Sequence, residues 1–238
     1  MREYQEFLKQ LKYIIINSGI IEKEVESKPI SEKNGYADAV VDISHWEEDV
    51  DFKLAERNGI LGVIHKASQG LKYVDSKYAE RRKEAENIGL LWGAYHFGVD
   101  GDGKDQAGHF LDVVGNDSKV LLALDIEGNE QGKNITPKQA EDFVEKIQEV
   151  KNSLPLIYGN ANFLKNFATP TLIKCPLWIA SWKEKPVLPR GWNNWTLWQY
   201  TNGKTAHSVE GIGKCDRNKF NGTLEELRKF WLSGEICF

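Results

Sequence analysis

Short apolar runs alternate with amphipathic segments from about residue 39 onward. Consecutive apolar positions indicate strands buried on both faces, and several of the segments between them have helical spacing. The pattern predicts strands at residues 40–44, 62–67, 91–97, 120–127, 154–158, 176–181 and 195–200. It predicts helices at residues 50–58, 75–87 and 106–114, another that begins at Thr136-Pro137, and a last one at residues 223–232.

Five strand-helix pairs come first, and β-rich segments follow them. Strands that alternate with helices form parallel sheets, and a chain of 238 residues fits one barrel-sized domain. The fold class expected is therefore α/β, a TIM-like barrel with five β/α units and a β-rich final third, over residues 39–238.

Residues 1–38 carry a different pattern. Residues 1–17 show helical spacing of large apolar side chains, and residues 22–34 are polar and charge-rich, so we expect an N-terminal amphipathic helix and a linker. The helix must bury its apolar stripe. Packing on the barrel is favoured, with dimerisation as the second choice, because the stripe is small for a stable dimer. The stripe consists of Tyr4, Phe7, Leu8, Leu11, Ile14 and Ile15.

Composition and charge narrow the function mainly by exclusion. The net charge is -4, with acids and bases interspersed, so the chain lacks the basic stripe of a nucleic-acid binder. No apolar run reaches the roughly 20 residues that span a membrane. An odd number of distant cysteines predicts at least one free thiol. Neither a metal nor another cofactor is expected, because H-E-x-x-H spacing is not found among His45, His65, His96, His109 and His207.

Candidate chemistry centres on two acids that end the apolar run at residues 120–127. Side chains alternate along a strand, so Asp125 and Glu127 are expected on one face at the carboxyl end, where barrels place their active sites. Repulsion and partial burial would raise at least one pKa, as glycosidic bond cleavage requires. The alternative is a structural aspartate beside a solvated glutamate. Asp42 ends the first strand, and Asp216 follows a glycine-rich turn, so both are further candidates or ordinary turn acids.

Seven motifs occur in a fixed order along the chain. They are Asp42-Ile43-Ser44, Lys66-Ala67-Ser68-Gln69-Gly70, Gly93-Ala94-Tyr95-His96-Phe97, Asp125-Ile126-Glu127, Leu177-Trp178-Ile179-Ala180, Trp198-Gln199-Tyr200 and Asp216-Arg217-Asn218-Lys219-Phe220. From about residue 39 to 232 the chain resembles the Chalaropsis-type lysozymes, family 25 of the glycoside hydrolases. The resemblance implies a flattened barrel with five β/α units and three further strands, and N-acetylmuramidase activity on peptidoglycan. It matches Asp42, Asp125, Glu127 and Asp216 residue by residue. Members commonly have Glu where Gln69 stands, and residues 1–38 have no counterpart.

The expected reaction is hydrolysis of the β-1,4 bond from N-acetylmuramic acid to N-acetylglucosamine. Glu127 would protonate the leaving oxygen, and Asp125 would orient the substrate's acetamide as the internal nucleophile, so that configuration is retained. Asp42 and Asp216 would hold hydroxyls or tune the acid pair. Substrate-binding candidates are Tyr95, Trp178, Trp198, Lys66 and Gln69, and core packing is the alternative for the three aromatic residues.

Two other functions stay open at this stage. One is a peptidoglycan- or chitin-binding barrel that has lost turnover, and the other is a chitinase-like enzyme with the same acid pair. The substrate places the activity at the cell wall. Residues 1–38 lack the pattern of a secretory signal, which suits a phage endolysin that stays in the cytoplasm until a holin releases it, delivery as part of a larger assembly, or a truncated chain.

Overall fold

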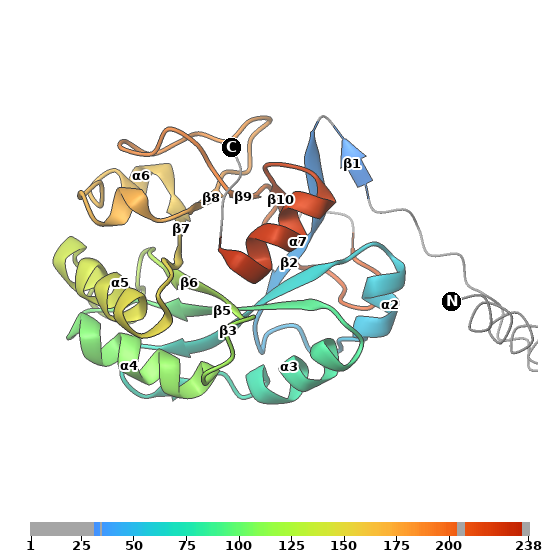
Figure 1. The fold of residues 1–238 in the computed structure, drawn as a ribbon, viewed down its shortest axis with the longest axis horizontal. Helices are drawn as coiled ribbons and strands as arrows, with labels where there is room; N and C mark the ends of the chain where they lie inside the picture. Colours follow the sequence, from blue (N-terminus) through green and yellow to red (C-terminus); the bar gives the residue numbers. More distant parts are fainter. Residues whose placement is uncertain (1–30, 34, 204–207, 235–238) are drawn as a thin grey trace, which may run out of the picture.

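A computed structural model describes residues 31–33, 35–203 and 208–234 (Figure 1). The helix predicted at residues 1–17 lies outside the described residues. In chain order the elements are β1 (Ser31–Lys33), β2 (Tyr36–Ile43), α2 (Phe52–Arg57), β3 (Gly62–Gln69), β4 (Tyr73–Val74), α3 (Tyr78–Asn87), β5 (Leu91–Phe97), α4 (Gly103–Val114), β6 (Leu121–Asp125), α5 (Pro137–Lys151), β7 (Leu156–Asn160), α6 (Ala161–Leu164), the 3-10 helix η1 (Leu172–Lys174), β8 (Leu177–Ala180), β9 (Leu197–Gln199), β10 (Asp216–Phe220) and α7 (Leu224–Ser233).

Eight of the strands close into a barrel. The ring runs β2-β3-β5-β6-β7-β8-β9-β10 and returns to β2. Its pairings are parallel except those of β10, which runs antiparallel to both β9 and β2. β1 and β4 extend the sheet as short antiparallel partners of β2 and β3. Five β/α units, from β2-α2 to β7-α6, precede three strands without intervening helices in the described residues, which confirms the predicted barrel.

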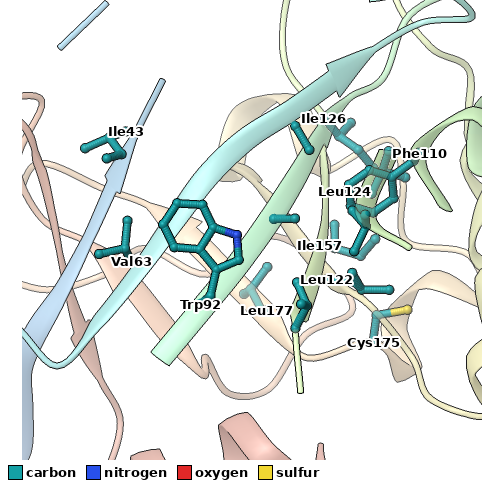
Figure 2. Packing of buried hydrophobic residues seen from close by; sticks show 14 of the residues in the cluster. Ile43, Val63, Trp92, Phe110, Leu122, Leu124, Ile126, Ile157, Cys175 and Leu177 are labelled. Atoms are coloured by element: carbon teal, nitrogen blue, oxygen red, sulfur yellow. The ribbon is translucent and has the colours of Figure 1, made fainter. Parts of the chain in front are cut away.

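The outer apolar layer lies between the strands and the helices around them. Figure 2 shows Val63 and Trp92 on neighbouring strands, and Phe110 of α4 beside Leu124 of β6, all of them buried. Phe110 also stacks on Phe143 of α5, with ring centroids 5.9 Å apart. α5 begins as predicted, because Thr136 forms a capping box with Gln139 and proline occupies the first turn.

The inner apolar layer is closed at one end by α7. Trp231 of this helix donates its indole N–H to the Trp92 carbonyl oxygen over 2.9 Å. Its ring lies so close to the starts of β3 and β5 that a Cβ added to Gly62 would be 2.9 Å from it. α7 therefore covers the end of the barrel at which the parallel strands begin, and their carboxyl ends are left for the site.

Several predicted element boundaries are wrong. β2 begins at Tyr36 rather than at residue 40, because residues 36–38 pair with β1, a strand inside the predicted linker. β6 ends at Asp125, so Glu127 lies in the following loop. Cys175 and Cys215 are unpaired and buried, which confirms a free thiol. No helix in the described part of the chain is long and apolar enough to cross a membrane.

Candidate active site

The four predicted acids reach the same end of the barrel by two routes. Asp42 and Asp125 lie at or next to the carboxyl ends of the parallel strands β2 and β6, and Glu127 follows two residues later. Asp216 is the first residue of β10, and the antiparallel register places it opposite Asp42. A strand that begins where its neighbours end thus adds a fourth acid to the cluster.

Asp125 and Glu127 are two interacting carboxyl groups at the end of β6. The Ile126 N–H donates to the Tyr158 carbonyl oxygen over 2.9 Å, so the extended backbone continues past the end of β6. Asp125 is only 4% exposed, and its buried Oδ1 has no hydrogen-bond partner among the described residues. Burial raises the pKa of both groups, and the charge of Glu127 raises the pKa of Asp125 further. One carboxyl of the pair is therefore held protonated above its usual pH range.

Lys66 on β3 opposes these shifts. Its ammonium lowers the pKa of both carboxyl groups, while burial lowers the pKa of the lysine itself. Nζ donates to Gln69 Oε1 over 2.8 Å and lies 5.0 Å from the centroid of the Phe97 ring. The structure thus brings Lys66 and Gln69 together at the acid pair.

Amide side chains hold Asp42. Asn218 Nδ2 donates to Asp42 Oδ2 over 2.7 Å, and Gln199 Nε2 donates to Asp42 Oδ1 over 3.0 Å and to Asp216 Oδ2 over 3.3 Å. Burial and the charge of Asp216 nevertheless raise the pKa of Asp42 well above its ordinary value. The Tyr158 hydroxyl donates to the oxygen of the same Gln199 amide over 3.0 Å. Gln199 therefore joins the acids of β2 and β10 to the strand next to β6.

A cavity of about 550 Å³ opens beside Glu127. Its wall includes Tyr158, Asn160, Ser181 and Trp182, the last of which is 60% exposed. The Trp182 indole N–H lies 3.3 Å from Gln199 Oε1, which ties this exposed ring to the Asp42 network. The cavity gives a substrate access to the glutamate.

Two predicted groove residues are in the interior instead. Trp178 is 1% exposed and donates to Asn218 Oδ1 over 2.6 Å; Trp198 is 5% exposed and donates to the Ser181 carbonyl oxygen over 2.6 Å. Their indoles are used in packing and internal hydrogen bonds, as the core alternative expects, and neither presents an exposed ring to a substrate in this structure. Tyr95 is half-buried, and burial followed by the charge of Asp125 raises its pKa well above the usual value.

Sequence reasoning missed the amides and the exposed indole. Gln199 and Asn218 belong to two of the seven motifs. An amide side chain within a buried barrel strand could have indicated them, because such a group needs a hydrogen-bond partner. Trp182 follows β8 by two residues at the same end as the acids. Among the described residues no cluster of three or more His, Cys, Asp or Glu side chains is placed to hold a metal ion.

Glycoside hydrolases use two carboxyl groups, one of which has a raised pKa and delivers a proton. Asp125 and Glu127 provide such a pair, and Glu127 borders a cavity at the open end of the barrel. Residues 41–209 match the family described as glycosyl hydrolases family 25, and the chain belongs to that family.

Known relatives agree with this assignment. The chain is 31% identical to lysozyme M1 of Streptomyces globisporus over 206 residues, which cover 79% of this chain and 69% of the relative. A bacterial lysozyme structure from Streptomyces coelicolor superposes with a TM-score of 0.76 at 27% identity, covering 86% of this chain and all of that one. The structure of a family 25 lysozyme from Aspergillus fumigatus superposes with a TM-score of 0.70 at 29% identity, covering 82% of this chain and 97% of that one. The protein is therefore a glycoside hydrolase of the lysozyme and muramidase type.

Proposed function

We propose that this chain is an N-acetylmuramidase that cleaves the β-1,4 bond between N-acetylmuramic acid and N-acetylglucosamine in peptidoglycan, with retention of configuration. Lysozymes and muramidases among its relatives support the substrate class. The observation that carries the mechanism is the placement of Asp125 and Glu127, two carboxyl groups of raised pKa, beside an open cavity. The cell wall would be the place of action.

Glu127 is assigned as the general acid. It borders the cavity, so its proton can reach the glycosidic oxygen of a bound strand, whereas Asp125 is almost fully covered. Burial raises the pKa of Glu127, which keeps the proton available at a pH where an exposed glutamate has lost it.

Asp125 is assigned to the substrate's acetamide. Its buried Oδ1 has no hydrogen-bond partner within the described chain, and an acetamide N–H would supply one. Accepting that hydrogen bond would hold the acetamide carbonyl oxygen toward the anomeric carbon, where it attacks as Glu127 protonates the leaving oxygen. In this state Asp125 carries the negative charge, which the nearby Lys66 ammonium stabilises. Water then opens the cyclic intermediate, with Glu127 as the base.

Asp42 and Asp216 are assigned to positioning. Asp42 accepts hydrogen bonds from two amides that also contact Trp178 and Tyr158, so it fixes the walls of the site around the acid pair. Neither acid is required to transfer a proton in this scheme.

Purified peptidoglycan tests the proposal directly. Mass spectrometry of borohydride-reduced products should find N-acetylmuramitol at the new ends, and proton NMR should find the β-anomer formed first. New N-acetylglucosamine ends would contradict the bond assignment, and an α-anomer would contradict retention. Binding without new reducing ends would favour the non-catalytic barrel. Faster cleavage of soluble chitin oligomers than of peptidoglycan would favour the chitinase-like alternative.

A further inference from the structure

Trp46 is the most exposed large apolar side chain of the described chain, at 78%. It stands in the turn after β2, four residues beyond Asp42, at the end of the barrel that carries the acids. Leaving an indole in water forgoes the free energy of burying it. Single exposed apolar residues are common on protein surfaces, so exposure alone does not indicate a role. The evidence for a role is the way in which the turn is held in place.

A buried arginine of α3 holds this turn in place. Arg81 of α3 is 4% exposed, and its guanidinium donates to the Ser44 carbonyl oxygen over 2.6 Å and to the Glu47 carbonyl oxygen. The Glu47 carboxylate accepts the Ser44 N–H over 2.7 Å, which closes the turn on itself. Both ends of the turn are therefore anchored, with Trp46 between them.

A second set of contacts fixes the ring next to the indole. Asp75, 2% exposed, accepts from the His45 backbone N–H over 3.1 Å, and its carboxylate lies 2.8 Å from His45 Nδ1. The imidazole lies beneath the indole, with centroids 4.6 Å apart and an interplanar angle of 35°. The Tyr73 hydroxyl approaches the same imidazole nitrogen at 3.2 Å. Trp46 thus contacts a ring that is held in place and keeps most of its own surface exposed.

Lys66 connects this turn with the acid pair. The Tyr73 ring lies 5.4 Å from Lys66 Nζ, and Lys66 acts on both Asp125 and Glu127. The Trp46 turn after β2, Glu127 after β6 and Trp182 after β8 all lie at the end of the closed barrel where the parallel strands end. A glycan strand bound over the acids lies on the same face of the molecule as the Trp46 turn.

We propose that Trp46, supported by His45 and flanked by Tyr73, is a platform for a pyranose ring of the glycan strand, remote from the bond that is cleaved. The proposal rests on the proposed function for the identity of the strand. An open indole face matches the C–H face of a sugar, and the neighbouring imidazole and phenol hydroxyl offer hydrogen bonds to its rim. A preformed, rigid ring gains more from such a contact than a mobile one, which gives the Arg81 and Asp75 contacts a role in binding.

Substrate length is the variable that tests the platform. The substrates are peptide-free glycan strands of graded length, from tetrasaccharide upward. Cleavage is measured for the parent, Trp46→Ala, Trp46→Phe and a control, Leu232→Ala. The control removes an exposed apolar side chain from α7, at the opposite end of the barrel. Trp46→Ala should lower kcat/KM on long strands about tenfold, through KM, and leave the shortest cleaved strand unchanged. Trp46→Phe should recover most of the loss, and Leu232→Ala should match the parent. An equal effect at every length, or none, would overturn the platform.

Binding provides the independent readout. In a Glu127→Gln background, calorimetric titration with the same long strands should show about tenfold weaker binding when Trp46→Ala is added. If the parent cleaves no strand and Trp46→Ala still weakens binding, the platform stands and the proposed function fails. If the parent cleaves and neither kcat/KM nor binding depends on Trp46, the platform fails alone.

Discussion

Asp216 lies opposite Asp42 because β10 runs antiparallel to β2, and the Gln199 amide nitrogen donates to both carboxylates. An amide N–H between two acids offsets part of their repulsion and keeps both at the open end of the barrel. The remaining repulsion raises the pKa of Asp42, and the charge of Asp216 is the largest cause of this shift after burial.

Asp216→Asn should therefore lower the pKa of Asp42, because the variant removes a neighbouring negative charge. Carbon-13 NMR of the labelled carboxyl groups against pH measures this directly. The control is Asp112→Asn, a change at an exposed position of α4, which should leave the pKa of Asp42 unchanged. Activity should fall less in Asp216→Asn than when either acid of the Asp125 and Glu127 pair is changed.

Glu127→Gln should reduce turnover by roughly 100-fold to 10,000-fold, the usual worth of a positioned proton donor. The amide keeps the shape of the side chain, so the melting temperature and the affinity for glycan strands should stay near those of the parent. Initial rates of reducing-end release, together with calorimetric binding, separate these effects. Parent-like rates in this variant would remove Glu127 from the acid role.

Asp125→Asn should lose activity and change the pH dependence of stability. The folded state raises the pKa of Asp125 above the unfolded value of about 3.9, so the folded protein holds a proton that the unfolded chain releases. The contribution of this group to stability is therefore present at low pH and is lost as the pH rises through the folded pKa. Urea unfolding from pH 4 to pH 8 should show a shallower decline for Asp125→Asn than for the parent. A purely structural aspartate, stabilised by its charge, would give the opposite slope.

The acids on parallel strands could be predicted from the sequence, and Asp216 could not be placed by the same argument. Asp42 and Asp125 lie close to the carboxyl ends of strands that the apolar pattern reveals. Asp216 starts its strand, which in an all-parallel barrel would put it at the opposite end. Only the reversed direction of β10, a property of long-range pairing, brings it to Asp42.

The tryptophans show a second limit of sequence reasoning. Trp178 lies in an apolar strand and is buried in the barrel, whereas Trp46 and Trp182 stand in turns just beyond strands and are exposed. A place directly after the carboxyl end of a strand marks both exposed indoles, whereas Trp192 and Trp195, in the loop before β9, are buried. The supports of the Trp46 turn, Arg81 and Asp75, come from distant elements and leave no local signal.

Lys66→Met should move the pH profile of kcat/KM toward higher pH. Lys66 lowers the pKa of both Asp125 and Glu127, so its loss raises both, and the singly protonated pair then persists to a higher pH. Both limbs of the profile should shift in the same direction, while Lys146→Met, on the outer helix α5, should leave them in place. Rates measured across the pH range on one substrate suffice. A profile that falls in height without moving would mean that Lys66 acts through packing alone.

Two N-terminal deletions separate the helix predicted at residues 1–17 from the start of the barrel. Removing residues 1–38 takes away β1 and the first three residues of β2. With them goes Asp38, whose carboxylate accepts from the Tyr200 hydroxyl over 2.8 Å and from Arg217 over 3.0 Å. Hydrogen bonds to a charged group are worth roughly 1.5 to 3 kcal/mol, so this deletion should lower the melting temperature whatever residues 1–30 do.

Removing only residues 1–30 tests the helix itself, and packing on the barrel remains our prediction for it. Loss of an apolar stripe packed on the barrel should then lower the melting temperature, with the deletion variant and the parent both monomeric by light scattering. A dimeric parent and a monomeric deletion variant would instead support dimerisation. The point variant Asp38→Asn in the full chain is the control, because it should reproduce part of the 1–38 effect and leave the oligomeric state unchanged. If the 1–30 deletion melts like a monomeric parent, the stripe does not pack on this barrel and the prediction is wrong.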